Sequence, residues 1–535
     1  MMPGLLGVPR QEAISEIQET STSGLRSRQS VIFGAAICLG LLTGVWLRWT
    51  GLAAQSLWAD EGYTTWFSKF SPAAQWHLMP WETQAPIYHV ALHYWTALWG
   101  TSENSFRALS ALFSSLSLIV VSLIARKMWR DRLFLLVSVM LSSVSLFQIW
   151  YAKESRSYAL LSFLLLVSVY CLQLYLDRPN ALRLVGVAAA LLAGLYTHNM
   201  ALYYVPGFVV FWFIYPSQMV FRERVKNAIV LALLVTLIYL PWLPILVQQA
   251  KSVHGYFWAP KPSLRDLCNT VCIFSGLDSY VLKHVRYYVP VGRLFGYWFW
   301  TAAAVAMVVL CVVATRQVQS PTDRRKALAV QVYSLLPLVL VFGWSRISTS
   351  VYVNRNLIGA AALLPLVLCA PAAVQVKRKK RLFQCLACIA LLGSVISLCL
   401  HQESKDDWRG VTEYLLKIPE QHRLVLVFQP YCQILVHYYA TGLFKSYPQP
   451  EIEGLITNFD SAPSGPGILP SLPTADTSAM LSKAIESHRY KEIDVALQME
   501  RLPTNMLSIP GLLRGRCVTV ENVEFEKIGI LRCIL

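Results

Sequence analysis

The stretch Ala228–Leu246 reads AIVLALLVTLIYLPWLPIL, contains no charged residue and is close to the ~20 residues that cross a bilayer as a helix. Similar apolar runs occur at Ala188–Leu195, Thr301–Thr315 and Leu382–Leu400. Of the 535 residues, 55% are hydrophobic and only 14% are charged, whereas soluble domains carry about 25% charged residues. One soluble core does not account for this composition, because single cores stop growing near ~250–300 residues. The sequence therefore predicts a polytopic α-helical membrane protein.

About eleven segments are predicted to span the membrane. They are 31–49, 107–125, 133–150, 157–176, 183–198, 200–216, 227–247, 292–315, 328–345, 356–376 and 382–400. A twelfth apolar stretch, 85–99, is shorter and contains His89 and His93. No cleavable signal peptide is evident, so we expect 1–30 to be a cytoplasmic tail held inside by its arginines.

The positive charges decide on which side of the membrane each loop lies. The chain carries +17, and residues 401–535 carry −3 from 13 Lys+Arg and 16 Asp+Glu, so the membrane portion carries +20. If 85–99 does not cross, the basic clusters at 126–132, 178–183, 222–226, 316–326 and 377–381 all face the cytoplasm, as such clusters usually do. If it does cross, all of them face outward. We therefore predict that 85–99 is an interfacial or half-embedded helix in an outside loop, 50–106.

This orientation places residues 402–535 outside the cytoplasm, after a transmembrane domain at 31–401. RLVLVFQ at 423–429 predicts a buried strand, 431–440 a helix, 460–477 a loop and 518–535 one or two strands, so we expect a small α/β domain. A second outside loop, 248–291, carries Tyr256, Phe257, Trp258, Tyr287 and Tyr288, which suit either an interfacial belt or a gate to the site. Cys517 and Cys533 could pair in an oxidising compartment, which the sequence alone leaves open.

Acidic and basic residues gather in the predicted outside segments. WADEGY at 58–63 places Asp60 and Glu61 among aromatic residues just after the first span, and Glu154 follows the third span between Lys153 and Arg156. A local salt bridge is the simpler interpretation of Glu154. Carboxylates kept near lipid nevertheless favour a function, and arginines suit an anionic lipid head group. The arginines on the same face are Arg107, Arg156, Arg346 and Arg355.

These segments together resemble the GT-C glycosyltransferases, in particular the group that includes protein O-mannosyltransferases, aminoarabinose transferases of lipid A and related lipopolysaccharide-core transferases. The resemblance covers most of the chain and rests on the order of several segments. They are WADEGY at 58–63, APIYHVALHYW at 85–95, SFRALSALF at 105–113, YAKESRSYALL at 151–161, YTHNMAL at 196–202, YVNRNLIGAAALLPLVL at 352–368 and KDDWRGVTEYL at 405–415. Ala85-Pro86 replaces the double proline usual in the family, and Asn354-Arg355-Asn356 replaces an Arg-Tyr pair.

The resemblance implies an inverting transfer of one sugar from a polyprenyl phosphate to a hydroxyl of a lipid, glycan or protein acceptor. Asp60 would be the general base, with Glu61 and Glu154 positioning the substrates. Arg107, Arg156, Arg346 and Arg355 would bind the lipid phosphate. The expected substrate contacts are Tyr63, Lys153, His198 and Tyr352.

We expect no cofactor and no metal, although clustered carboxylates could hold a divalent ion. The expected partners are the lipid-linked sugar donor, an unidentified acceptor and membrane lipids, but no nucleic acid. The expected location is the cytoplasmic (inner) membrane. A transporter or flippase of a lipid-linked sugar is the alternative; transporters often place ionisable residues at mid-membrane, where the predicted spans are nearly free of acids.

Overall fold

The computed structural model describes thirteen parts of the chain: 30–129, 131–254, 259–276, 295–369, 377–400, 404–417, 423–427, 432–443, 451–453, 485–486, 491–498, 513 and 516–535. The predicted N-terminal tail, the five aromatic residues of 248–291 and the predicted loop 460–477 lie outside these residues.

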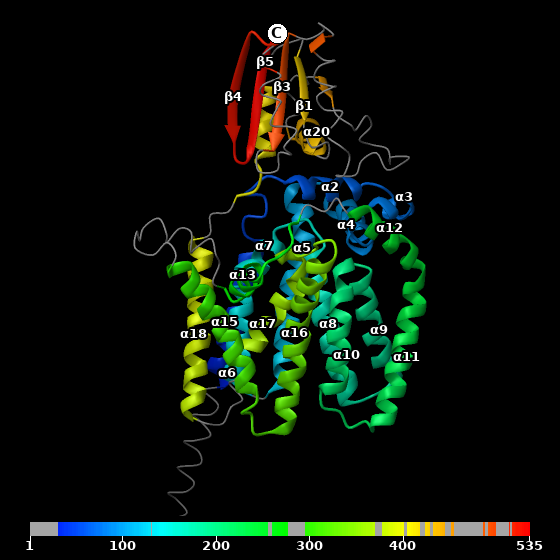
Figure 1. The fold of residues 1–535 in the computed structure, drawn as a ribbon, viewed down its shortest axis with the longest axis vertical. Coiled ribbons are helices and arrows are strands. Elements are labelled where there is room, and N and C mark those ends of the chain that lie inside the picture. Colours follow the sequence, from blue (N-terminus) through cyan, green and yellow to red (C-terminus); the bar gives the residue numbers. More distant parts are fainter. Residues whose placement is uncertain are drawn as a thin grey trace, which may run out of the picture.

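A bundle of long helices makes up most of the molecule (Figure 1). Its helices are Ser30–Trp49, α5 (Glu103–Met128), α6 (Arg132–Ser143), α7 (Leu146–Ala152), α8 (Tyr158–Asp177), α9 (Ala181–Leu195), α10 (Val205–Ile214), α11 (Phe221–Tyr239), α15 (Phe295–Thr315), α16 (Pro321–Ile347), α17 (Ile358–Cys369) and α18 (Lys377–Leu400). In the described residues, five helices are long and apolar enough to cross a membrane, or six if α6 and α7 form one span bent by 51°. The chain is thus a multi-pass membrane protein, whereas eleven crossings stay a prediction.

The apolar surface of the bundle suits a lipid solvent. Leu42, Leu233 and Leu392 are well exposed on the Ser30–Trp49 helix, α11 and α18. Inside the bundle, serines of α5 bond to carbonyls of their own helix, as Ser115 does to Ala111 O at 2.7 Å. Such bonds satisfy polar groups where no water reaches them.

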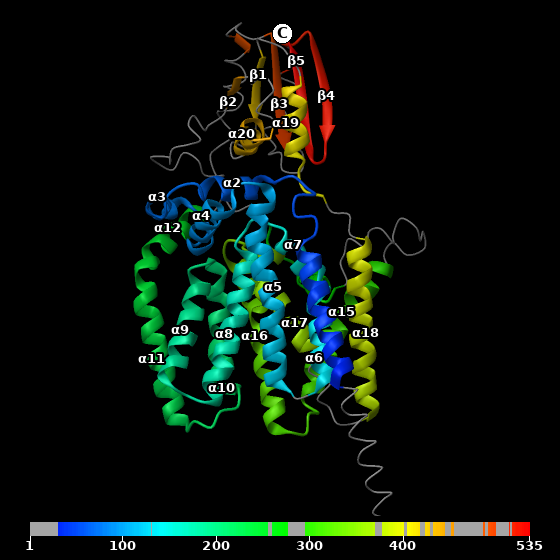
Figure 2. The same ribbon diagram turned by 180° about the vertical axis from the view of Figure 1, so that it is seen from behind.

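Short helices cover one end of the bundle, among them α2 (Ala59–Phe67), α3 (Pro72–Leu78), α4 (Ile87–Trp99) and α12 (Leu243–Val253) (Figures 1 and 2). The other short helices are η1 (Met79–Trp81), η2 (Asn199–Tyr204), η3 (Leu240–Trp242), α13 (Leu264–Phe274) and η5 (Asn354–Leu357). Helix α4 has 13 residues and ends at Gly100, whose φ of +81° favours glycine. It is shorter than the ~20 residues that cross a bilayer, and the interfacial position of 85–99 stays a prediction.

A five-stranded sheet stands beyond this end of the bundle (Figure 2). Its order is β2 (Glu451–Glu453), β1 (Arg423–Val427), β3 (Glu492–Gln498), β5 (Ile528–Ile534) and β4 (Thr519–Phe525). Strand β1 runs parallel to β2 and β3, whereas β5 pairs antiparallel with β3 and β4. Helices α19 (Trp408–Leu416) and α20 (Gln433–Thr441) accompany it, and Cys517 forms a disulfide with Cys533. The predicted strand at 423–429 and helix at 431–440 correspond to β1 and α20.

Candidate active site

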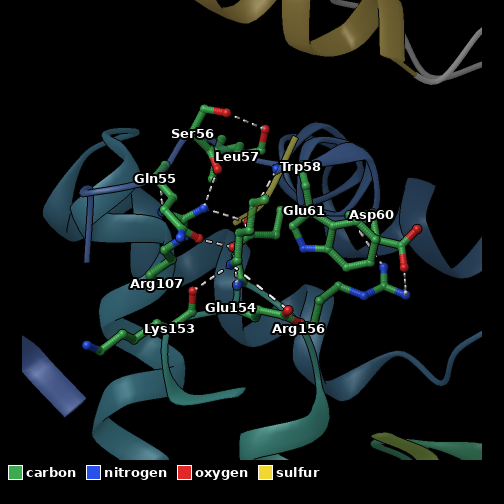
Figure 3. Close-up of polar contacts among 12 residues, drawn as sticks. Gln55, Ser56, Leu57, Trp58, Asp60, Glu61, Arg107, Lys153, Glu154 and Arg156 are labelled. Atoms are coloured by element: carbon green, nitrogen blue, oxygen red, sulfur yellow. Dashed lines mark hydrogen bonds and ion pairs between the residues drawn. The ribbon is translucent and has the colours of Figure 1, made fainter. Parts of the chain in front are cut away.

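Helix α2 brings the two adjacent acids to the end of the bundle. Trp58 precedes the helix, and its backbone N–H donates to Glu61 Oε2 at 3.4 Å. Asp60 and Glu61 lie in the first turn, where negative charge suits the exposed N–H groups of a helix. Because neighbouring helical residues point about 100° apart, the two carboxylates face different surroundings (Figure 3).

Glu61 is fully buried in a set of hydrogen-bond donors. Arg107 donates two hydrogen bonds to its carboxylate, from Nε to Oε1 at 2.8 Å and from Nη2 to Oε2 at 2.6 Å. The backbone N–H of Ser155 donates to Oε1 at 2.8 Å. Lys405 Nζ lies 3.2 Å from Oε2. Burial raises the pKa of Glu61, but Arg107, Lys405 and these hydrogen bonds outweigh it and lower the pKa to about 2.

Arg107 uses all five of its N–H groups inside the protein. Besides the two bonds to Glu61, Nη1 donates to Leu52 O at 2.6 Å and Gln55 O at 2.7 Å, and Nη2 donates to Ser56 O at 2.8 Å. A guanidinium has five such donors. Glu61 and the turn that leads into α2 accept all five of these donors in this structure, and the role of Arg107 in binding the lipid phosphate stays a prediction.

Asp60 faces two other arginines and remains 21% exposed. Arg355 Nη1 lies 3.3 Å from Asp60 Oδ2, and Arg156 Nη2 lies 4.0 Å from the same oxygen. Arg156 also donates to Thr64 Oγ1 at 2.6 Å, which fixes it against α2. The guanidinium of Arg355 lies 5.6 Å above the Trp58 ring and 5.8 Å above the Tyr158 ring. The structure thus brings Asp60, Arg156 and Arg355 together from three distant segments.

Glu154 lies in the turn between α7 and α8, next to the same cluster. Its side chain is 4% exposed, and Lys405 Nζ lies 4.0 Å from Oε1. Burial raises the pKa of Glu154 to about 7; Lys405 and Arg355 lower it in part, and Glu61 and Asp60 raise it further. A carboxyl group with this pKa exists in both protonation states near neutral pH.

Tyr63 and His198 both lie close enough to Arg156 for its charge to act on them. Burial, and then the nearby buried carboxyl of Glu82, raise the pKa of Tyr63. The His198 ring lies 5.6 Å from Tyr158, and its Nδ1 accepts the N–H of Met200 at 3.1 Å. Burial first, and then Arg156 and Arg355, lower the pKa of His198 to about 3, so its ring is neutral at pH 7.

Comparisons with known proteins agree with this architecture at the level of the fold. No protein-family model and no curated protein sequence matches the chain. The solved structure of ArnT from Cupriavidus metallidurans in the apo state superposes with a TM-score of 0.55 at 11% identity, over 95% of this chain and 98% of that chain. The oligosaccharyltransferase of Archaeoglobus fulgidus in the apo form superposes with a TM-score of 0.51 at 12% identity, over 90% of this chain and 71% of that chain. Both are GT-C glycosyltransferases.

The chain has the GT-C fold. The resemblance of its segments to GT-C enzymes is therefore confirmed for the fold.

Three residues predicted to touch substrate are not in contact with the acids of the GT-C bundle. The Lys153 side chain extends away from Asp60 and Arg156 (Figure 3). Arg346 is exposed and donates to Pro262 O at 3.3 Å, before α13. Tyr352 bonds to Thr270 Oγ1 at 2.8 Å on α13, so it helps to hold that helix. Arg346 thus contacts the segment before α13, and Tyr352 contacts α13 itself.

Two site residues were missed by the sequence analysis, Glu82 and Lys405. Glu82 is the one charged residue between Lys69 and Glu103, in a segment expected at the membrane surface. That isolation is a usable signal, because a lone acid near lipid has a reason to be there. Lys405 is the first residue of the segment KDDWRG, where the two aspartates that follow it suggest a local ion pair. Nothing local marks Lys405, because its partners lie about 250 residues or more before it in the chain.

The described residues contain no group of three His, Cys, Asp or Glu side chains placed to hold a metal ion.

Proposed function

We propose that the chain is an inverting glycosyltransferase that moves one monosaccharide from a polyprenyl-phosphate donor to a hydroxyl of a lipid, glycan or protein acceptor. The observation that carries the proposal is a partly exposed carboxylate, Asp60, beside two guanidinium groups at one end of a GT-C bundle. The carboxylate is a proton acceptor, and the guanidinium groups suit a phosphate. Direct displacement at an anomeric carbon needs these two functions.

In the proposed reaction Asp60 takes the proton of the acceptor hydroxyl as its oxygen attacks the anomeric carbon. The bond from that carbon to the phosphate oxygen breaks, and the electron pair leaves with the polyprenyl phosphate. Arg355 and Arg156 would meet the charge on that phosphate. Since both arginines now pair with Asp60, a bound donor would draw them toward its phosphate and free the carboxylate for the proton.

We further propose that this end of the bundle is extracytoplasmic, with eleven spans between a cytoplasmic tail (1–30) and the region 402–535. Arg107 and Lys127 lie twenty positions apart on α5, or about 30 Å at 1.5 Å per residue. Lys127 pairs with Asp177, at the end of α8, and Lys326 donates to Met128 O. Lys127 and Lys326 thus lie at the end of α5 opposite the site. The Cys517–Cys533 disulfide suits an oxidising compartment beyond the site.

The test is the Asp60→Asn variant. Asparagine keeps the size of the side chain but does not accept the proton, so we expect sugar transfer to fall by about 10²–10⁴-fold while expression and membrane insertion are unchanged. The matched control is Asp323→Asn, an acid at the start of α16 that pairs with Lys326. Mass spectrometry of surface glycolipids and glycoproteins from cells with and without each variant measures the transfer.

The same measurement identifies the acceptor and the sugar. Full transfer by Asp60→Asn would rule out the mechanism. A lipid-linked sugar that changes sides without any new glycosidic bond would favour the transporter alternative instead.

A further inference from the structure

Lys405 reaches into the acid cluster from the segment that leads to the sheet. It precedes α19, and its side chain is 6% exposed. Its Nζ donates to Glu61 Oε2 at 3.2 Å and to Lys153 O at 2.9 Å, and it lies 5.6 Å above the Trp150 ring. A buried ammonium group with this set of acceptors is built into the site rather than placed there by chance.

The residues after Lys405 fasten the same segment to the turn that precedes α2. Ser56 Oγ donates to Asp406 O at 2.5 Å and accepts the N–H of Trp408 at 3.1 Å. Arg409 donates to Ala53 O at 3.0 Å. Carbonyl groups of this turn also accept hydrogen bonds from Arg107. The position of the C-terminal region and the position of α2 therefore both depend on the contacts of this turn.

Glu61 and Glu154, the two acids beside Lys405, differ in how many other positively charged partners they have. Glu61 already has the bidentate pair with Arg107. For Glu154, Lys405 is the one ion-pair partner within 4.0 Å among the described residues, and Glu154 Oε2 has no hydrogen-bond partner in that part of the chain. The other charged groups that act on Glu154 are Asp60, Glu61 and Arg355. Without Lys405, the Glu154 carboxylate would face two acids and one arginine.

We propose that Lys405 is a positioning residue, which holds the Glu154 carboxylate beside Asp60 and so makes the seating of the C-terminal region a requirement for a working site. The inference deepens the proposed glycosyl transfer and rests on it for its consequence in activity. The contact of Lys405 with Glu154 can be tested without any knowledge of the sugar or the acceptor.

The test is an infrared titration of the full-length protein in detergent. The Glu154 band is assigned as the protonated-carboxyl signal that Glu154→Gln removes. The positive charge of Lys405 favours the ionised form of Glu154, so Lys405→Met should move the midpoint of that band upward by about 1–3 pH units, as expected for an opposite charge at this distance. The matched control is Lys417→Met, a lysine on the same segment that is 55% exposed and pairs with Glu413. It should leave the midpoint unchanged.

Lys405→Arg keeps the positive charge and should restore the wild-type midpoint, which separates a charge effect from misfolding. A midpoint in Lys405→Met that equals that of the wild type would overturn the proposal.

The transfer assay then tests the consequence for activity. We expect the acid limb of the pH profile of transfer in Lys405→Met to move upward with the midpoint, whereas a purely structural defect would lower the rate equally at every pH. If the wild type transfers no sugar, the proposed function fails, and the titration still decides the role of Lys405. If the wild type is active and Lys405→Met has the same pH profile of transfer as the wild type, Lys405 has no role in activity. The proposed glycosyl transfer then stands.

Discussion

Asp60 and Glu61 are neighbours in the chain, yet their carboxylates do different things. Glu61 joins α2, Arg107, Ser155 and Lys405, whereas Asp60 faces Arg156 and Arg355 and keeps an exposed edge. A base needs access to its substrate, and a fully buried carboxylate surrounded by five donor groups has none. At the residue scale the geometry therefore favours Asp60 as the reacting group and gives Glu61 the part of holding the site together.

This division predicts the effect of Arg107→Met. The variant leaves the buried Glu61 carboxylate without its bidentate partner and three backbone carbonyls without donors. Removal of one member of a buried ion pair costs about 3–5 kcal/mol, so we expect a large fall in the unfolding temperature measured in detergent. Arg346→Met is the control, because that exposed side chain makes one long hydrogen bond, and its unfolding temperature should stay near that of the wild type. Equal unfolding temperatures for the two variants would contradict the structural role of Arg107.

The sequence indicated which residues share one face, but not which of them touch. Positive-charge counting placed Asp60, Arg107, Glu154, His198 and Arg355 together on the predicted outer side, and in the structure they belong to one chain of neighbouring side chains. The hydrogen bonds of Arg107 to the backbone could not be predicted, because the acceptors are carbonyl groups of a turn that folds around the guanidinium. Contacts of this kind depend on tertiary structure and leave no sequence pattern.

At the scale of elements, α2 and α20 approach each other so closely that Gly62 has a packing role. A Cβ atom added at Gly62 would lie 2.5 Å from Leu435 Cδ2 and 2.6 Å from its Cγ, and Leu435 is fully buried. We expect Gly62→Ala to loosen the contact between these helices at a cost of about 1–3 kcal/mol. Proteolysis between α18 and α19 should then be faster, and Leu435→Ala in the same variant should slow it again. Unchanged proteolysis of Gly62→Ala would show that α20 does not rest on α2 in solution.

The break between α6 and α7 shows where element prediction from sequence ends. Residues 133–150 were predicted as one span, but the helix stops at Ser143 and resumes at Leu146 with a bend of 51°. No proline or glycine marks this place. Arg48, from the Ser30–Trp49 helix, donates to Ser142 O at 3.0 Å and Ser143 O at 3.0 Å. The freed carbonyls accept hydrogen bonds from another helix at a serine-rich break, Ser142-Ser143-Val144-Ser145, and the Arg48 contact is the part that the local sequence does not show.

At the scale of the whole molecule, the chemistry and the orientation depend on each other. The segments that carry Asp60, Glu154 and Arg355 meet at the end of the bundle where α2 lies, next to the sheet (Figure 1). Lys127, near the end of α5, and Lys326, near the start of α16, lie at the other end of α5. If α4 crossed the membrane, the lysines and the sheet would exchange sides. The charge distribution and the short α4 together favour the site and the sheet outside the cytoplasm.

Reporter fusions test this orientation. Alkaline phosphatase fused after Leu535 should be active, because it folds in an oxidising compartment, whereas the same enzyme fused after Ser320, between α15 and α16, should be inactive. Green fluorescent protein at the same two positions should give the opposite pattern and controls for expression. An active phosphatase at Ser320 together with an inactive one at Leu535 would show that the orientation in the membrane is the opposite of the proposed one. Asp60 would then face the cytoplasm, where the lipid-linked donor would have to be bound before it reaches the outer leaflet.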